Sequence, residues 1–186
     1  MSDFADSAAV SELMRHYGKW RSIYALAGKP SRDEPRWDDE GRLWLSYGYP
    51  HPDWTAFVIE PQLDGYKLFR ASTERRNEPV LSPQGFFSRL DVAGKYVIAK
   101  VGNYLRIDCR MDPVTWAWED AGLEDRVGEV VYSDREVKYF HSSDENNYFV
   151  MTLADRPYSH ILPLTYDDLN SLLLMGFPEH VTCAAK

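Results

Sequence analysis

The sequence predicts an α+β fold, a mostly antiparallel sheet of hairpins and a meander packed with helices, in a single domain over residues 1–186. Two groups of strand-like segments indicate the sheet, one on each side of a helical stretch in the middle of the chain. Helical patterns at both ends of the chain indicate the remaining helices. At 186 residues and 44% hydrophobic composition, the chain is long enough to bury a core without disulfides or a metal.

The first expected element is a helix over 8–17. Ser7 is placed to cap it, because a serine oxygen accepts a hydrogen bond from a backbone N–H in the first turn. Four residues recur at helical spacing and form its apolar face: Val10, Leu13, Met14 and Tyr17. The proline- and charge-rich stretch 29–40 that follows is typical of an exposed loop.

Three strand-like segments come next, at 42–47, 55–62 and 66–72. The last two are joined at Asp64-Gly65, a dipeptide that favours a tight turn because its glycine accepts positive φ. We therefore expect an antiparallel hairpin with this dipeptide at its tip.

A central helix is expected after Ser82-Pro83, which has the form of a helix start with a serine cap and a proline in the first turn. Its apolar face is formed by residues at three- and four-residue steps: Leu90, Gly94, Val97, Ile98, Val101 and Leu105. Because glycine weakens helices, a break is expected near Gly94.

The second half repeats the strand pattern at 129–132, 136–141 and 148–153, and a polar turn over 142–147 joins the last two. These segments predict an antiparallel meander. A closing helix is expected to begin at Thr165, whose hydroxyl is placed to cap an acidic first turn. Its apolar residues are Leu169, Leu172, Leu173 and Leu174, and it should stop at Gly176 and Pro178.

Charge and targeting signals exclude several classes of protein. The net charge is −8, with 29 carboxylates against 21 lysines and arginines, which argues against nucleic acid as a partner. The acidic N-terminus lacks the features of a signal peptide, and no segment approaches the roughly 20 apolar residues that span a bilayer. Cys109 and Cys183 are too few for a disulfide framework. We therefore expect a cytoplasmic protein without a membrane partner.

No pattern of residues indicates catalysis, a cofactor or a metal. The five histidines are scattered, and none has another at the i, i+4 spacing of a helical metal site. No glycine-rich phosphate loop is present. Cys109 has Asp108 and Asp112 nearby, which disfavour a thiolate. The sequence therefore predicts a binding protein, not an enzyme.

Aromatic residues beside carboxylates suggest where a basic protein partner binds. Trp37 precedes Asp38 and Asp39 directly, and aromatic residues make up 14% of the chain. Four of the six tryptophans lie in its first third: Trp20, Trp37, Trp44 and Trp54. The alternative is that these tryptophans fill the core and that the acidic run is solvated surface.

A second candidate interaction surface lies between residues 112 and 129, a segment that contains six carboxylates and only one basic residue, Arg126. It contains Trp116 and Trp118, followed by Glu119 and Asp120. In a strand the two tryptophans would share a face, and in a loop they would project together. A packed tryptophan pair under a solvated acidic segment is the alternative.

The order of these features resembles a known family. After the first helix come the aromatic segment Arg42-Leu43-Trp44-Leu45-Ser46-Tyr47-Gly48-Tyr49, the hairpin, the central helical stretch and the helix of Thr165-Tyr166-Asp167-Asp168-Leu169. Over most of its length the chain thus resembles the bacterial immunity protein 61 family, which includes the antitoxin of the tuberculosis necrotizing toxin.

The resemblance implies a cytoplasmic protein without catalysis that binds a secreted toxin domain, in a 1:1 complex, and blocks its active site. For the necrotizing-toxin member, the inhibited activity is NAD glycohydrolysis. On this interpretation the hairpin tip of Asp64, Gly65 and Tyr66 is the preferred element for insertion into the toxin's substrate cleft, because a narrow tip enters where a helix cannot.

Two other functions stay open at this point. A small-ligand protein or enzyme would use an aromatic pocket with a titratable group, built from Tyr47, Tyr49, His51 and Trp54. A regulatory or scaffold subunit would bind an endogenous partner in the absence of any toxin.

Overall fold

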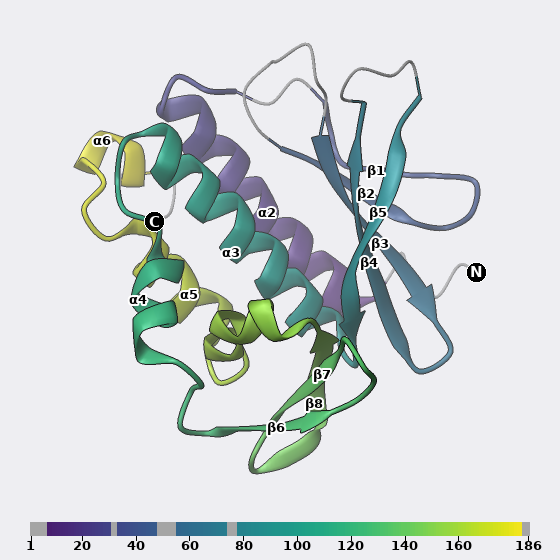
Figure 1. The fold of residues 1–186 in the computed structure, drawn as a ribbon. Helices are drawn as coiled ribbons and strands as arrows, with labels where there is room; N and C mark the ends of the chain where they lie inside the picture. Colours follow the sequence, from purple (N-terminus) through teal and green to yellow (C-terminus); the bar gives the residue numbers. More distant parts are fainter. Residues whose placement is uncertain (1–6, 31–32, 48–54, 74–77, 184–186) are drawn as a thin grey trace.

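The computed structural model describes residues 7–30, 33–47, 55–73 and 78–183. Its strands form one sheet in the order β1-β2-β3-β4-β5-β8-β7-β6, and every neighbouring pair is antiparallel. Helices α2 and α3 lie against the face of β2–β5, while β6–β8 lie together below them in Figure 1. The α+β fold class predicted from the sequence is confirmed.

The N-terminal helix α2 spans Ala8–Leu26 and is longer than expected. Ser7 caps it as predicted, with its Oγ accepting a hydrogen bond from the Val10 backbone N–H at 3.2 Å. The helix continues beyond Tyr17 because Trp20, Ile23 and Tyr24 extend the same buried face. Trp20 is therefore a core residue.

The β3–β4 hairpin forms where it was expected, but the stretch 29–40 is not wholly a loop. It contains strand β1 (Arg36–Trp37), which pairs with β2 (Leu43–Ser46). Strands β3 (Thr55–Gln62) and β4 (Gly65–Ser72) pair in register over their full lengths. Gln62 lies opposite Gly65, so the two central turn residues are Leu63 and Asp64, one position earlier than predicted.

The helix start expected at Ser82-Pro83 is wrong, because both residues lie within strand β5 (Val80–Phe87). Pro83 is tolerated there since β8 pairs only with Phe86 and Phe87, which leaves the earlier part of that side of β5 without a paired strand in the described chain. The register with β4 also shifts next to Pro83, between Leu68 and Phe69. Long-range pairing thus overrides the local capping signal.

The central helix α3 runs without interruption over Leu90–Asp108, so the break expected at Gly94 is also wrong. A Cβ at Gly94 would collide with the Tyr166 hydroxyl and lie 2.9 Å from Leu13 Cδ1. This glycine therefore lets the elements that carry Leu13 and Tyr166 approach α3 closely.

The second half contains the predicted meander, with small differences in the bounds. Its strands are β6 (Val127–Val131), β7 (Val137–His141) and β8 (Asp144–Met151). His141 pairs with Asp144, so the turn between β7 and β8 is shorter than the expected 142–147. A 3-10 helix, η1 (Leu153–Ile161), follows β8.

The closing helix α5 (Tyr166–Leu174) begins with the predicted cap. Thr165 and Asp168 form a capping box, in which each side chain accepts a hydrogen bond from the other's backbone N–H. A short helix, α6 (Glu179–Thr182), ends the described chain. Among the helices described, none is long and apolar enough to cross a membrane.

The main core lies between the helices and one face of the sheet, and polar side chains connect its elements. Trp20 Nε1 of α2 donates to Asn170 Oδ1 of α5 at 2.8 Å, and Asn170 Nδ2 lies 2.8 Å from His16 Nδ1. A smaller apolar cluster forms from sheet residues of alternate orientation: Trp44, Ala56, Val58 and Ala71. Trp44 is thus buried, as the alternative interpretation of the tryptophans held.

Candidate protein interaction surfaces

The tip of the β3–β4 hairpin is the most exposed apolar point in the described structure. Leu63 is 99% exposed at the centre of the turn, and Asp64 beside it is exposed as well. When a partner covers an apolar side chain that was fully in water, the free energy of the complex is lowered. The hairpin is predictable from the sequence, but Leu63 was not singled out there; its position between polar residues in a turn was the available signal.

Gly65 has a structural reason to be glycine. A Cβ at this position would collide with the backbone oxygen of Phe87 and lie 2.7 Å from the Phe86 ring. The glycine thus allows β5 to pack against the base of the turn. Any test of the tip should therefore change Leu63 and Asp64 and leave Gly65 in place.

Tyr66 lies just behind the tip and borders a shallow hollow of about 480 Å³, together with Glu12, Arg89 and Asp91. Burial raises the pKa of the Tyr66 phenol, and the charge of Asp91 adds to the effect. The three residues predicted at the hairpin tip therefore have different environments. Asp64 faces solvent, Gly65 supports the turn and Tyr66 is half-buried beside the hollow.

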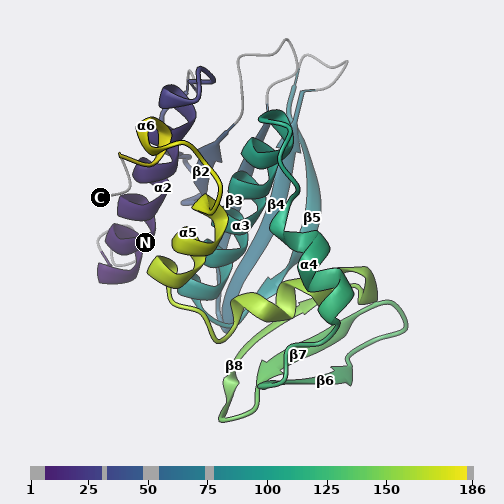
Figure 2. The ribbon, with the colours of Figure 1, turned by 90° about the vertical axis from the view of Figure 1, so that its left-hand side faces the viewer.

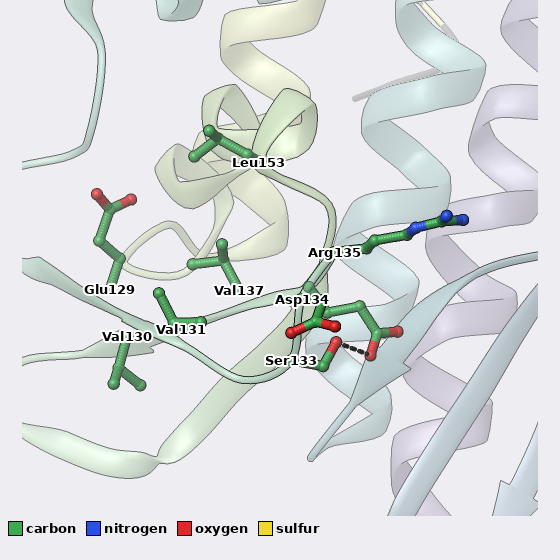
Figure 3. A pocket seen from close by; sticks show the side chains of 9 residues that line it. Glu129, Val130, Val131, Ser133, Asp134, Arg135, Val137 and Leu153 are labelled. Carbon is green, nitrogen blue, oxygen red and sulfur yellow. Dashed lines mark hydrogen bonds between the residues drawn. The ribbon is translucent and has the colours of Figure 1, made fainter.

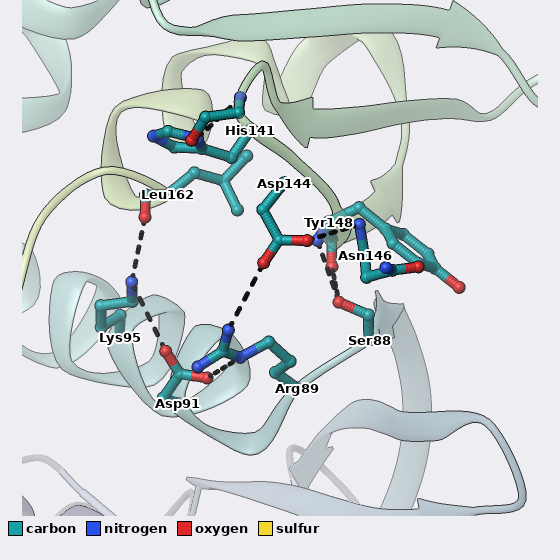
Figure 4. Close-up of polar contacts among 10 residues, drawn as sticks. Ser88, Arg89, Asp91, Lys95, His141, Asp144, Asn146, Tyr148 and Leu162 are labelled. Carbon is teal, nitrogen blue, oxygen red and sulfur yellow. Dashed lines mark hydrogen bonds and ion pairs between the residues drawn. The ribbon is translucent and has the colours of Figure 1, made fainter.

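Ion pairs hold the start of α3 beside this hollow (Figure 4). Arg89 Nε lies 2.9 Å from Asp91 Oδ1, and Arg89 Nη1 lies 3.8 Å from Asp144 Oδ2 on β8. Only the Arg89–Asp144 pair links α3 to β8, and as an exposed ion pair it contributes little to stability.

Lys95 and Ser88 fix the same junction from the interior side (Figure 4). Lys95 Nζ is buried and donates to the carbonyl oxygens of Leu162 at 3.2 Å and Leu164 at 2.9 Å. Burial lowers the pKa of the Lys95 ammonium, while the charge of Asp91 opposes that shift. Ser88 Oγ donates to the Tyr148 carbonyl oxygen and accepts from its N–H, both at 2.9 Å.

In the predicted surface of Trp37, Asp38 and Asp39, the central carboxylate is already engaged in contacts within the protein. The Asp38 carboxylate organises the β1–β2 turn, since its Oδ2 accepts from Trp44 Nε1 at 2.6 Å and from Arg42 Nε at 2.7 Å. Partial burial acts to raise the pKa of Asp38, but these hydrogen bonds and the Arg42 charge outweigh it and lower the pKa to about 2. Trp37 is 37% exposed, and Asp39 is exposed as well.

The two tryptophans of the acidic segment lie on a helix, α4 (Val114–Ala121), and not on a strand or loop. Residues two positions apart on a helix point in nearly opposite directions, so they do not share a face. Trp118 is 6% exposed and stacks on His160 with ring centroids 5.8 Å apart, whereas Trp116 is 56% exposed. The outer face of α4 thus presents Trp116 together with the exposed Glu119 and Asp120.

These predicted surfaces do not merge into one site. Figure 1 shows α4 among the helices and the strands β1–β4 across the molecule from it, and in Figure 2, where the helices face the viewer, the strands β2–β5 lie behind them. A small partner that covers the hairpin tip would therefore not also cover the face of α4.

Of the four residues proposed for the alternative aromatic pocket, the structure describes only Tyr47, and Tyr47 does not line a ligand-sized space. Tyr49, His51 and Trp54 lie outside the described residues. Tyr47 is packed between the rings of Phe57 and Tyr104, with centroids 4.9 and 5.4 Å away. The space bordered by Tyr47 is about 10 Å³, close to the minimum for a single water molecule. Within the same described ranges, no group of three or more His, Cys, Asp or Glu residues is arranged to hold a metal ion.

Fold and surfaces together define an α+β protein built on one antiparallel sheet, with exposed apolar and acidic side chains at a hairpin tip and on a helix. Among solved structures, the fold is similar to that of Rv3902c from M. tuberculosis, with a TM-score of 0.54 and 15% sequence identity. The similarity covers 83% of this chain and 86% of that one, and at this identity it shows the fold alone. No family model and no curated protein matches the sequence.

Proposed function

We propose that the protein is a cytoplasmic immunity protein, without catalysis of its own, which binds a secreted toxin domain and occludes its active site. The toxin we propose is a NAD glycohydrolase of the necrotizing-toxin type. The sequence resemblance to the immunity protein 61 family supports this function. The similarity to Rv3902c agrees with the α+β fold that the resemblance implies.

The observation that carries the proposal is the shape of the β3–β4 hairpin. Eight residues on each side pair in register and end in a two-residue turn with Leu63 fully in water. The part that would enter a cleft is the two-residue turn of Leu63 and Asp64, because β5 pairs with β4 as far as Tyr66 and flanks the hairpin below it. A preformed hairpin also loses little conformational entropy on binding.

Charge supports the same mechanism. The chain carries a net charge of −8, which accelerates the capture of a basic toxin domain through long-range attraction. Fast capture matters because an intracellular toxin consumes substrate until it is bound. The apolar contact at Leu63 would then slow dissociation, which sets most differences in affinity between related complexes.

Of the three candidate surfaces, the hairpin tip carries the most exposed apolar side chain, Leu63, and this supports its choice over the others. The α4 surface was predicted with two tryptophans, but Trp118 is buried and only Trp116 is available to a partner. A helix face is also too broad to enter a substrate cleft.

The experiment measures NAD loss by a necrotizing-toxin-type domain from the same genome, titrated with this protein. We expect inhibition that saturates at one molecule per toxin, a 1:1 complex in native mass spectrometry, and weaker inhibition as NAD is raised. If an active toxin retains full activity in the presence of excess folded protein, this pairing is wrong. Inhibition that is insensitive to NAD concentration would contradict occlusion of the active site.

A further inference from the structure

The last strand of the sheet, β6, has an open edge. It ends the strand order and pairs only with β7 in the described chain. Tyr132 N–H donates to the Glu136 oxygen at 2.9 Å, and Ser142 N–H donates to the Arg126 oxygen at 2.7 Å. Hydrogen-bonded positions alternate along an antiparallel strand, so the backbone groups of Glu129 and Val131 point outward.

Exposed apolar side chains accompany this open edge. Val130 is 51% exposed and Val131 77% exposed, and Tyr132 after them is exposed as well. Val131 and Leu153 border a hollow of about 440 Å³, shown in Figure 3. An edge strand with this composition promotes pairing with another strand unless it is covered. At the other end of the sheet, β1 is only two residues long and offers far less backbone.

We propose that β6 pairs antiparallel with β6 of a second copy of the chain, about a two-fold axis at Val130. In this register the outward-facing Glu129 is hydrogen-bonded to Val131 of the second copy, and Val131 to its Glu129. Val130 lies opposite Val130, which buries two exposed side chains against each other. Tyr132 lies opposite Gly128, which Phe140 already covers with its ring, so the two aromatic rings come into contact.

The charges that flank β6 are complementary in this arrangement. Asp125 and Arg126 precede the strand, and Asp134 and Arg135 follow it, all four exposed. An antiparallel two-fold pairing brings the first flank of one copy to the second flank of the other. Arg126, which also pairs with Glu124 of its own copy at 3.0 Å, then approaches Asp134, and Asp125 approaches Arg135. This self-complementarity favours a second copy over an unrelated strand as the occupant.

Like charges are kept apart at the centre of the pair. Glu129 lies opposite an apolar valine, and its carboxylate already accepts a hydrogen bond from Arg156 Nε at 3.0 Å. The net charge of −8 on each copy still opposes association. We therefore expect a reversible dimer in sedimentation equilibrium at roughly 0.15 M salt, where long-range repulsion is screened.

Cysteine cross-linking tests the register directly. Val130→Cys places two thiols in a non-hydrogen-bonded pair with Cα atoms about 4.5 Å apart, within the range that a disulfide needs. Val131→Cys is the matched control, because its equivalent in the second copy is a diagonal neighbour about 7–8 Å away. Both changes are made with Cys109→Ser and Cys183→Ser, since both native thiols are free.

We expect Val130→Cys to form a reducible covalent dimer at least tenfold faster than Val131→Cys. Val130→Lys should abolish the non-covalent dimer, while Ile107→Lys, at a similarly exposed site on α3 (54%), should leave it intact. A wild-type protein that stays monomeric up to its solubility limit would overturn the proposal. Equal cross-linking of the two cysteine variants would overturn the register.

Discussion

At the residue scale, the buried polar side chains determine how stability responds to pH. Asn170 Nδ2 donates to His16 Nδ1, because the other end of this amide accepts from Trp20. The Nδ1 atom must therefore be unprotonated for this contact to exist, and the Arg15 guanidinium, 2.7 Å from Nε2 of the same ring, also disfavours the charged imidazolium. Burial lowers the pKa of His16 below its ordinary 6.5, and Arg15 adds to the effect while Asp167 opposes it.

The lowered pKa predicts an acid-sensitive fold. The unfolded chain binds a proton at His16 near pH 6.5 and the folded chain only at lower pH, so this stability is present above 6.5 and lost as pH falls. Urea unfolding from pH 8 to pH 5 should show the loss, and His16→Gln should reduce it. An unchanged pH profile in a folded His16→Gln protein would contradict this account.

Asp38 was predicted to contact a partner, but its hydrogen bonds to Arg42 and Trp44 predict a structural role. Asp38→Ala should destabilise the protein by about 1–3 kcal/mol, because it leaves these donors without their acceptor. Asp39→Ala, at the exposed neighbour, should change stability by less than about 0.5 kcal/mol. Urea unfolding of the two variants measures the difference, and equal effects would show that the turn does not depend on Asp38.

At the scale of elements, local patterns predicted the structure where local interactions decide it. The Thr165 cap, the Ser7 cap and the β3–β4 hairpin all formed, since caps and turns depend on a few neighbouring residues. Ser82-Pro83 misled the prediction because pairing with β4 outweighed its capping signal. Gly94 misled it because the glycine serves packing between elements, which a single sequence does not reveal.

A pair of glycine substitutions tests this interpretation of Gly94. Gly94→Ala should lower the free energy of unfolding by about 1–3 kcal/mol, because its Cβ has no room beside Tyr166 and Leu13. Gly18→Ala on α2 should raise it by about 0.5–1 kcal/mol, since a Cβ there meets nothing within 4 Å and alanine favours helix. Thermal or urea unfolding measures both changes in the free energy of unfolding. Two changes of the same sign would contradict this interpretation of Gly94.

At the scale of the whole molecule, the sequence predicted more of the fold than of the site. The aromatic and acidic residues could be found by composition, but their exposure depends on tertiary packing. Thus Trp118 and Trp44 are buried, whereas Leu63, whose only signal in the sequence was its place between polar residues in a turn, has the most exposed large apolar side chain described. Which side chains reach a partner is decided by the assembled sheet and helices.

The central claim is that the tip of the β3–β4 hairpin occludes the toxin's active site. The most direct test is the inhibition constant of a variant with both Leu63→Ala and Asp64→Ala, compared with Ile107→Ala as a control at another exposed apolar site. The account predicts at least a 30-fold loss for the tip variant, about 2 kcal/mol, and less than a twofold change for the control. A tip variant that is folded and inhibits as well as the wild type would contradict the claim.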